Sequence, residues 1–124
     1  MRSLTREDVP VAIEGDGVEF RTTPIGGDQS VAFVRLPAGA NLAPALKGLP
    51  DDLCQCPHWG YMISGRLRMH TARGEETYAA GDAFYWAPGH APEALEDTEY
   101  VDFSPTHELQ EVVAHITSGA AAAA

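Results

Sequence analysis

The chain has 124 residues, 44% of them hydrophobic, which is enough for one folded domain and leaves no room for a second core. Eighteen acidic residues against eight basic ones give a net charge of −10. Such a surface repels phosphate backbones and anionic lipids, so we expect no nucleic acid and no membrane among its partners. The first eight residues lack the apolar core of a signal peptide, and we expect a cytoplasmic protein.

Short segments of β-forming residues fill most of the chain. Twelve glycines and nine prolines suit many strands joined by tight turns rather than a helical bundle. The strands that the alternation of apolar and polar residues predicts are 9–13, 18–22, 30–36, 58–63, 66–70, 75–78, 83–87 and 99–103. Several short strands at regular spacing predict an all-β sandwich or a closed barrel.

The end of the chain has a helical pattern. The apolar residues at helical spacing are Leu109, Val112, Val113 and Ile116. With Ser104 as N-cap and a proline at the first helical position, the pattern predicts a helix over 105–117. We expect its apolar stripe to cover one end of the barrel or to contact a second subunit. We divide the chain into one domain, 1–118, and an alanine-rich tail, 119–124.

Two segments resemble the paired motifs of the cupin superfamily. The first is Cys54-Gln-Cys-Pro-His-Trp-Gly-Tyr-Met-Ile-Ser-Gly65, and the second is Gly81-Asp-Ala-Phe-Tyr-Trp-Ala-Pro-Gly-His90. Their order and separation also match the family. The resemblance implies an all-β fold of the RmlC-like type, a double-stranded β-helix (jelly-roll) barrel with a short C-terminal helix.

A longer run, 48–61, contains the pattern Cys-x-Cys-Pro-His-Trp-Gly-Tyr. It is similar to a subgroup of bacterial single-domain cupins, a resemblance that implies a shape and no particular activity. Because cupins commonly pair, the resemblance also implies a homodimer.

The usual metal ligands of cupins are replaced in this chain. Metal-dependent cupins carry two histidines one residue apart, then a glutamate, and a third histidine after the second motif. The first three of these positions hold Asp52, Cys54 and His58, and the last holds Pro92. The standard site of three histidines and one glutamate is therefore not expected.

A different set of metal ligands is available near the mouth of the barrel. Cys54, Cys56 and His58 are spaced by two, so an extended backbone would turn all three side chains the same way. His90, on the bend after the second motif, would complete the set. Such a sulfur–nitrogen site suits zinc, iron(II) or copper(I). The alternative is that no metal binds, since a buried cysteine often serves as a small hydrophobe and Pro57 can break the alternation.

His90 and Glu93 are the candidate catalytic residues, as proton carriers in the pocket. The plainer alternatives are a loop hydrogen bond for His90 and a solvated surface position for Glu93. The candidate residues of a ligand pocket are Trp59, Tyr61, Met62, Tyr85 and Trp86. Ordinary core packing is the alternative for these side chains.

Three kinds of function stay open, because one barrel fold hosts many activities. The leading interpretation is a pocket that binds a small organic molecule, with or without a transition metal. The second is a metal-dependent oxygenase, isomerase or hydrolase. The third is a structural or sensor protein without catalysis.

Overall fold

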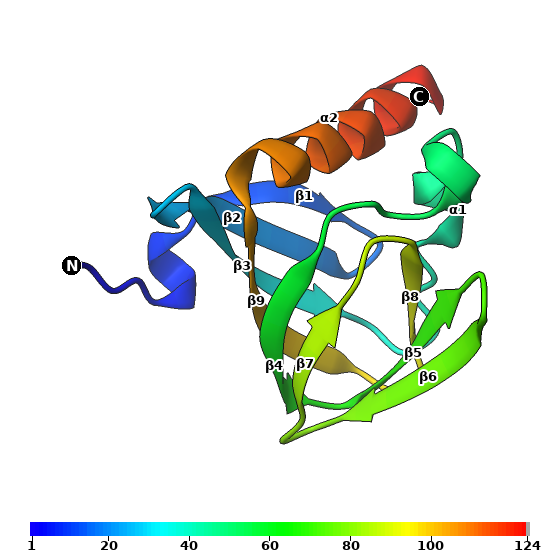
Figure 1. Cartoon of the computed structure of the whole chain (residues 1–124), viewed down its shortest axis with the longest axis horizontal. Helices are drawn as coiled ribbons and strands as arrows, with labels where there is room; N and C mark the ends of the chain where they lie inside the picture. Colours follow the sequence, from blue (N-terminus) through cyan, green and yellow to red (C-terminus); the bar gives the residue numbers. More distant parts are fainter. Residues whose placement is uncertain (124) are drawn as a thin grey trace.

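The computed structural model describes residues 1–123, and the side chains of residues 1–119. Within this part of the chain, strands form two antiparallel sheets that face each other as a barrel, and the last helix lies across one end (Figure 1). The structure thus confirms the predicted all-β jelly-roll barrel with a C-terminal helix.

The larger sheet has six strands. In spatial order they are β1 (Val11–Gly15), β2 (Val18–Gly26), β3 (Gln29–Leu36), β9 (Thr98–Pro105), β4 (His58–Ser64) and β7 (Ala83–Trp86). The smaller sheet has three strands, β6 (Gly74–Ala79), β5 (Arg66–Thr71) and β8 (His90–Ala94), also in spatial order. All neighbouring strands are antiparallel, and β9 joins the first half of the chain to the second by pairing with both β3 and β4.

Strand β8 was not expected from the sequence. Its segment follows a Pro-Gly bend and contains Pro92, two signals that favour a loop. A proline can occupy β8 because this strand is at the edge of the three-stranded sheet, where its missing N–H leaves no ladder bond unmade. Pro92 lies opposite Met69 of β5, and its carbonyl accepts a bond from the Leu42 N–H (3.0 Å).

Among residues 1–123 the structure has four helical segments outside the strands: η1 (Arg6–Asp8), α1 (Ala43–Leu46), η2 (Pro50–Asp52) and α2 (Thr106–Ala123). Helix α2 begins one residue later than predicted and continues to Ala123, while position 124 of the predicted tail lies outside the described residues. Ser104 is not its N-cap, because Ser104 is a buried residue of β9. No helix within residues 1–123 is long and apolar enough to cross a bilayer.

The core has two parts. The first fills the barrel between the two sheets, and its largest members are Leu36, Met62, Leu67, Met69, Phe84, Trp86 and Tyr100. The second lies between the barrel and its helices, and it contains Leu46, Cys54, Cys56, Ala91, Leu109 and Val112. The apolar stripe of α2 therefore covers one end of the barrel, as one of the two alternatives for this helix predicts.

Candidate functional site

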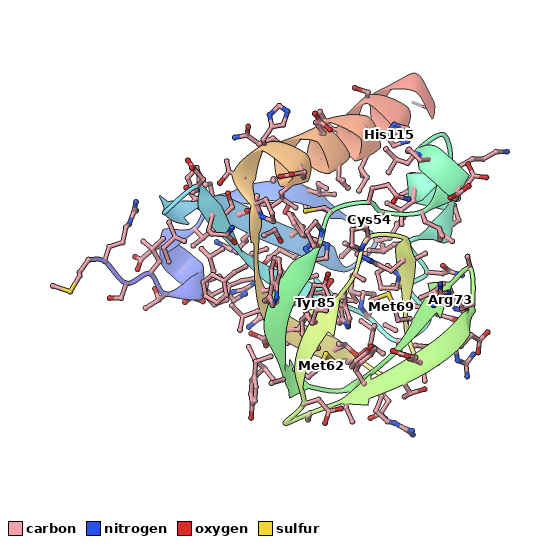
Figure 2. The ribbon with its side chains drawn as sticks, viewed as in Figure 1. Cys54, Met62, Met69, Arg73, Tyr85 and His115 are labelled. Carbon is pink, nitrogen blue, oxygen red and sulfur yellow. The ribbon has the colours of Figure 1, made fainter. Side chains whose placement is uncertain are left out.

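Two distant segments of backbone meet at the end of the barrel beneath α2. The Cys54 N–H donates to the His90 carbonyl (2.8 Å), and the Gly89 N–H donates to the Cys54 carbonyl (2.7 Å). This bridge sets Cys54 beside the first residue of β8. Cys54 lies near α2, whereas Met62 lies toward the opposite end of the barrel (Figure 2). The site is thus built at one end of the fold.

A thiol and two imidazoles converge there. One ligand atom each from Cys54, His58 and His90 lies within 4.8 Å of the others, and all three residues are buried. The Cys54 Sγ is 3.8 Å from Nε2 of His58, and the centroids of the two imidazole rings are 5.0 Å apart. Sulfur and imidazole nitrogen are the donors that zinc, iron(II) and copper(I) prefer, so these residues fit a transition metal.

Both imidazoles are held through Nδ1. The Nδ1–H of His90 donates to the Ala87 carbonyl (2.7 Å), which leaves Nε2 of the neutral ring with a free lone pair. Nδ1 of His58 is 2.6 Å from the Ser104 hydroxyl oxygen, and its Nε2 faces Cys54. A histidine that binds metal through one nitrogen typically has its other nitrogen fixed in this way.

Asp102 is a functional candidate that the sequence analysis missed. Its side chain is buried on β9, with Oδ2 3.8 Å from Nδ1 of His58, and within the described part of the chain Oδ1 has no hydrogen-bond partner. Burial raises the pKa of Asp102 to about 8, and the Ser104 hydroxyl opposes that rise. Alternation in this strand gave no signal for it, because Asp102 lies on the face opposite to the apolar Val101 and Phe103, and it is this polar-looking face that the structure buries.

Burial keeps the side chains of Cys54, His58 and His90 uncharged near neutral pH. It lowers the pKa of His58 to about 3, with help from the neighbouring His90, and it also lowers the pKa of His90. Burial raises the pKa of the Cys54 thiol to about 11. The contact of His58 with Asp102 therefore joins two neutral groups at pH 7 rather than an ion pair. A metal bound here would displace the thiol proton.

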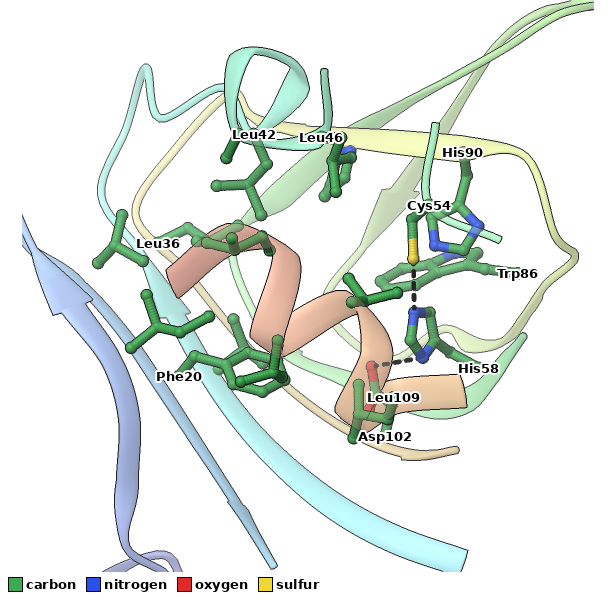
Figure 3. Close-up of a pocket in the computed structure, with 18 of the residues that line it drawn as sticks. Phe20, Leu36, Leu42, Leu46, Cys54, His58, Trp86, His90, Asp102 and Leu109 are labelled. Atoms are coloured by element: carbon green, nitrogen blue, oxygen red, sulfur yellow. Dashed lines mark hydrogen bonds and ion pairs between the residues drawn. The ribbon is translucent and has the colours of Figure 1, made fainter. Parts of the chain in front are cut away.

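A cavity of about 90 Å³ adjoins these residues. Its wall is polar on one side, where Cys54, His58, His90 and Asp102 lie, and apolar elsewhere (Figure 3). The apolar side comes from the strands and helices around it, through Phe20, Leu36, Leu42, Leu46, Leu109, Val112 and Ile116. Such a wall suits a small molecule with an apolar body and one polar end.

A second hollow, an open groove of about 460 Å³, lies on the other side of Trp86 and His90. Its lining includes Met69, Tyr78 and Tyr85 as well as those two residues. Because Trp86 and His90 line both hollows, they form part of the wall between the groove and the inner cavity.

The structure does not bring Cys56 to the group of Cys54, His58 and His90. The Cys56 thiol packs in the core cluster beneath α2, with Sγ 3.6 Å from the Pro57 carbonyl oxygen. The expected alternation fails because residues 55–57 are not in a strand, and the chain curls so that the Cys54 Sγ faces the Cys56 carbonyl (3.9 Å).

Glu93 also lies away from the cavity. It is part of β8, and its carboxylate accepts a hydrogen bond from His70 Nε2 (2.9 Å). Arg68 approaches the same carboxylate at 3.7 Å. The neighbouring β8 positions, Pro92 and Ala94, are buried, so Glu93 belongs to a polar cluster on the opposite face of the small sheet from the cavity.

The five aromatic and sulfur-containing pocket candidates divide into three groups. Trp86 lines both hollows, and Tyr85 lines the outer groove. Met62 is fully buried in the core of the barrel. Trp59 and Tyr61 lie on the outer face of the large sheet, where about half of each side chain is exposed. Alternation along β4 explains why Met62, like His58, points inward while Trp59 and Tyr61 point outward.

Comparison with solved structures places this architecture in a known class. An RmlC-like cupin from Shewanella frigidimarina NCIMB 400 superimposes with a TM-score of 0.59 over 82% of this chain and 88% of its own, at 14% identity. KdgF from a Halomonas species superimposes with a TM-score of 0.58 over 82% of this chain and 90% of its own, at 24% identity. A sugar phosphate isomerase of the cupin superfamily, from Silicibacter pomeroyi DSS-3, superimposes with a TM-score of 0.56 over 84% of this chain and 75% of its own, at 17% identity.

The chain has the cupin fold. Models of protein families give no match to the sequence, and curated proteins give none either. The resemblance to the narrower bacterial subgroup stays a prediction. Within the cupin barrel, Cys54 and His58 stand where the motif comparison puts the second histidine and the glutamate of metal-dependent members. His90, two residues before the position of the last histidine, completes the group in this chain.

Proposed function

We propose that this cupin binds a transition metal through Cys54, His58 and His90, and a small organic molecule in the adjoining cavity. The observation that supports this most is the convergence of one thiol and two oriented imidazoles on the wall of an otherwise apolar cavity. Apolar packing alone gives no reason to bury three potential ligands so close together.

The donor set favours zinc, with iron(II) or copper(I) as alternatives. Three protein ligands leave at least one coordination position for water or for a bound molecule. A metal at such a site supplies Lewis-acid chemistry. The protein's own contribution is to hold both imidazoles through Ser104 and the Ala87 carbonyl and to keep bulk water away with its apolar wall.

The size and lining of the cavity restrict the organic ligand. Drug-sized ligands occupy roughly 300–1,000 Å³, and a cavity of about 150 Å³ holds benzene. A cavity of about 90 Å³ therefore suits a molecule of only a few heavy atoms. Among the described residues its lining includes no lysine or arginine, so it offers nothing to neutralise a sugar phosphate, although one structure with this fold carries that substrate in its name. A short aliphatic molecule with one oxygen- or sulfur-containing end fits better.

A metal-dependent enzyme is the second candidate, and Asp102 is the observation that favours it. Its buried carboxyl lines the cavity, and one of its oxygens has no hydrogen-bond partner among the described side chains, so it is placed to exchange a proton with a bound molecule. Turnover of a short-chain substrate that is lost in Asp102→Asn, while metal content is kept, would identify this second function.

The test begins with the metal content of chain purified without chelators. We expect about one zinc or iron per chain, or one zinc after reloading of stripped protein. Thermal unfolding of the zinc-loaded chain should then shift upward with some short-chain alcohols, acids or thiols, because a ligand that binds only the folded state stabilises it.

Stripped protein that cannot be reloaded with zinc, iron(II) or copper(I) would exclude the metal site. Loaded protein whose unfolding temperature does not respond to any member of a graded series of short-chain molecules would exclude the organic ligand. His107→Ala is the control for surface histidines, since His107 is exposed on α2 and forms its ion pair with Glu111, outside the cavity.

A further inference from the structure

A buried tyrosine of β9 lies on the wall of the inner cavity. Tyr100 is 4% exposed and is paired with Val34 of β3 and with Met62 of β4. It lines the same cavity as the three proposed metal ligands. Neither the group of metal ligands nor the hydrogen bonds that orient its two histidines include this tyrosine.

The ring of Tyr100 has a fixed position in the core. It packs edge-to-face with Trp86, with ring centroids 5.1 Å apart, and with Phe84, with centroids 6.1 Å apart. Aromatic pairs prefer this arrangement, and a close-packed interior leaves the ring little freedom to turn. The hydroxyl at the end of the ring therefore has a defined place relative to the cavity.

This hydroxyl lies near the polar side of the cavity. Burial raises the pKa of Tyr100 well above its ordinary value, and Asp102 and Cys54, which both line the cavity, raise it further. Within the described part of the chain, no hydrogen bond acts on the hydroxyl. A phenol is protonated at neutral pH even without these effects, so the hydroxyl is a hydrogen-bond donor.

Tyr100 belongs to a row of four oxygen-bearing side chains on the inner face of β9. The row consists of Thr98, Tyr100, Asp102 and Ser104, all buried. The Thr98 hydroxyl donates to a backbone carbonyl of β5 (3.0 Å), and the Ser104 hydroxyl contacts Nδ1 of His58 (2.6 Å). Asp102 approaches the same imidazole nitrogen at 3.8 Å. Tyr100 differs from the other three because its oxygen has no such partner among the described residues.

Packing alone does not explain the hydroxyl. A buried hydroxyl without a partner costs free energy, and phenylalanine would fill the same space without that cost. A partner in the cavity offsets the cost, and the adjoining metal centre indicates its chemistry. A Lewis acid and a hydrogen-bond donor both bind electron-rich atoms, and a carbonyl oxygen offers two lone pairs and no hydrogen that needs a partner of its own. A thiol sulfur is a weak acceptor and gains little from a phenol.

We propose that the Tyr100 hydroxyl donates a hydrogen bond to the ligand of the inner cavity, and that this ligand is a short aliphatic carbonyl compound. The inference rests on the proposed function, because it takes the cavity as the ligand site and adds the residue that selects the ligand's polar end. Tyr100 orients the carbonyl oxygen toward the side of the cavity where the metal ligands lie. The aliphatic part is left against the apolar wall, and a cavity of about 90 Å³ keeps it short.

Calorimetric titration of the zinc-loaded chain tests this hydrogen bond. The probes are butanone and butanethiol, which have the same number of carbon atoms and differ in the polar atom. We expect Tyr100→Phe to raise the dissociation constant of butanone roughly 10-fold and to leave that of butanethiol unchanged. Tyr78→Phe is the matched control and should bind both probes like the wild type, since Tyr78 lines the outer groove and its hydroxyl donates to Glu76 (2.6 Å).

Two further measurements separate this role from a structural one. Without ligand, Tyr100→Phe should unfold at the same temperature as the wild type or at a higher one, because it loses a hydroxyl that no described residue satisfies. Its zinc affinity, measured by competition with a chromophoric chelator, should equal that of the wild type. A clear drop in the unfolding temperature would make the hydroxyl structural, and a loss of zinc would make it a metal ligand. Either result would overturn the inference.

The titration also distinguishes this inference from the proposed function. Equal affinity for butanone in the wild type and in Tyr100→Phe would remove the role of Tyr100 and leave the proposed function intact. A wild type that binds butanethiol and not butanone, or neither of them, would rule out the carbonyl class. The proposed organic ligand itself is excluded only if the whole series of short-chain molecules has no effect on the zinc-loaded chain.

Discussion

His58 and His90 differ from surface histidines in that each Nδ1 already has a fixed partner. For His90 the partner is a backbone carbonyl, which no side-chain substitution removes. For His58 it is the Ser104 hydroxyl, 2.6 Å away. The orientation of His58 therefore depends on one replaceable group, and the metal proposal can be tested there.

Ser104→Ala should weaken zinc binding about 10- to 100-fold, because His58 loses the hydrogen bond that orients its ring. Competition against a chromophoric chelator measures the affinity. Ser30→Ala is the matched control, since Ser30 is also buried and lies directly opposite Ser104 on β3, but bonds Thr106 instead. An unchanged affinity in Ser104→Ala, or an equal loss in both variants, would contradict this role for Ser104.

Asp102 should make the stability of the metal-free chain depend on pH. Its pKa rises from an ordinary 3.8 to about 8 on folding, so between these values the folded chain keeps a proton that the unfolded chain releases. The free energy of unfolding contributed by Asp102 is thus full below pH 3.8 and is lost as the pH rises through 8, by at most about 1.4 kcal/mol per pH unit. The lowered pKa values of His58 and His90 act in the opposite direction and mainly below pH 6.5.

Urea unfolding at pH 6.5 to 8 isolates this effect. We expect the wild type to lose stability over that interval and Asp102→Asn to lose much less. Glu14→Gln, an exposed carboxyl on β1, should keep the wild-type slope. If Asp102→Asn retained the full slope, the buried carboxyl would not be its source.

Helix α2 links the stability of the barrel to the shape of the cavity. Leu109 is 3% exposed, packs in the cluster beneath the helix and lines the cavity. Leu109→Ala should lower the free energy of unfolding by about 2–5 kcal/mol, because it removes buried methyl groups and leaves a larger void. Urea unfolding measures the loss, and Gln110→Ala, at an exposed position of the same helix, should change it little. Equal effects of the two substitutions would mean that α2 does not close the barrel in solution.

Most strands could be predicted because the alternation of apolar and polar residues is visible in a short stretch of sequence. The structure places these segments in the two sheets of the barrel. Strand β8 could not, since Pro92 is tolerated only at a sheet edge, and edge position is a property of the topology. Ser104 has the sequence signature of an N-cap, but the pairing of β9 with β3 continues through it to Pro105. The start of α2 is instead fixed by Thr106, whose N–H donates to the Asp28 carbonyl (2.9 Å).

Part of the candidate site could also be predicted from the sequence. Cys54, His58 and His90 could be grouped from the two motifs, because the motifs imply that their segments meet. Cys56 could not be excluded from the group by its spacing. Residues 55–57 are not in a strand, so the spacing of two residues does not tell which way a side chain points. Asp102 is separated from the motifs in sequence and reaches the site only because β9 pairs with β4.

In the molecule as a whole, the six-stranded sheet separates two environments. Its inner face carries His58, Asp102 and Trp86 beside the cavity, and its outer face carries the exposed side chains of Trp59, Tyr61 and Tyr85. The chain as a whole carries a net charge of −10, and for this reason we expect no nucleic acid among its partners.

The two cysteines provide the most direct test of the metal centre. Both are buried and reduced, and they are two residues apart, but only the Cys54 thiol is grouped with His58 and His90. Zinc per chain should be measured after reloading in the wild type, in Cys54→Ala and in Cys56→Ala. We predict about one zinc for the wild type and for Cys56→Ala, and almost none for Cys54→Ala. Full zinc content in Cys54→Ala, or equal loss in both variants, would contradict the site.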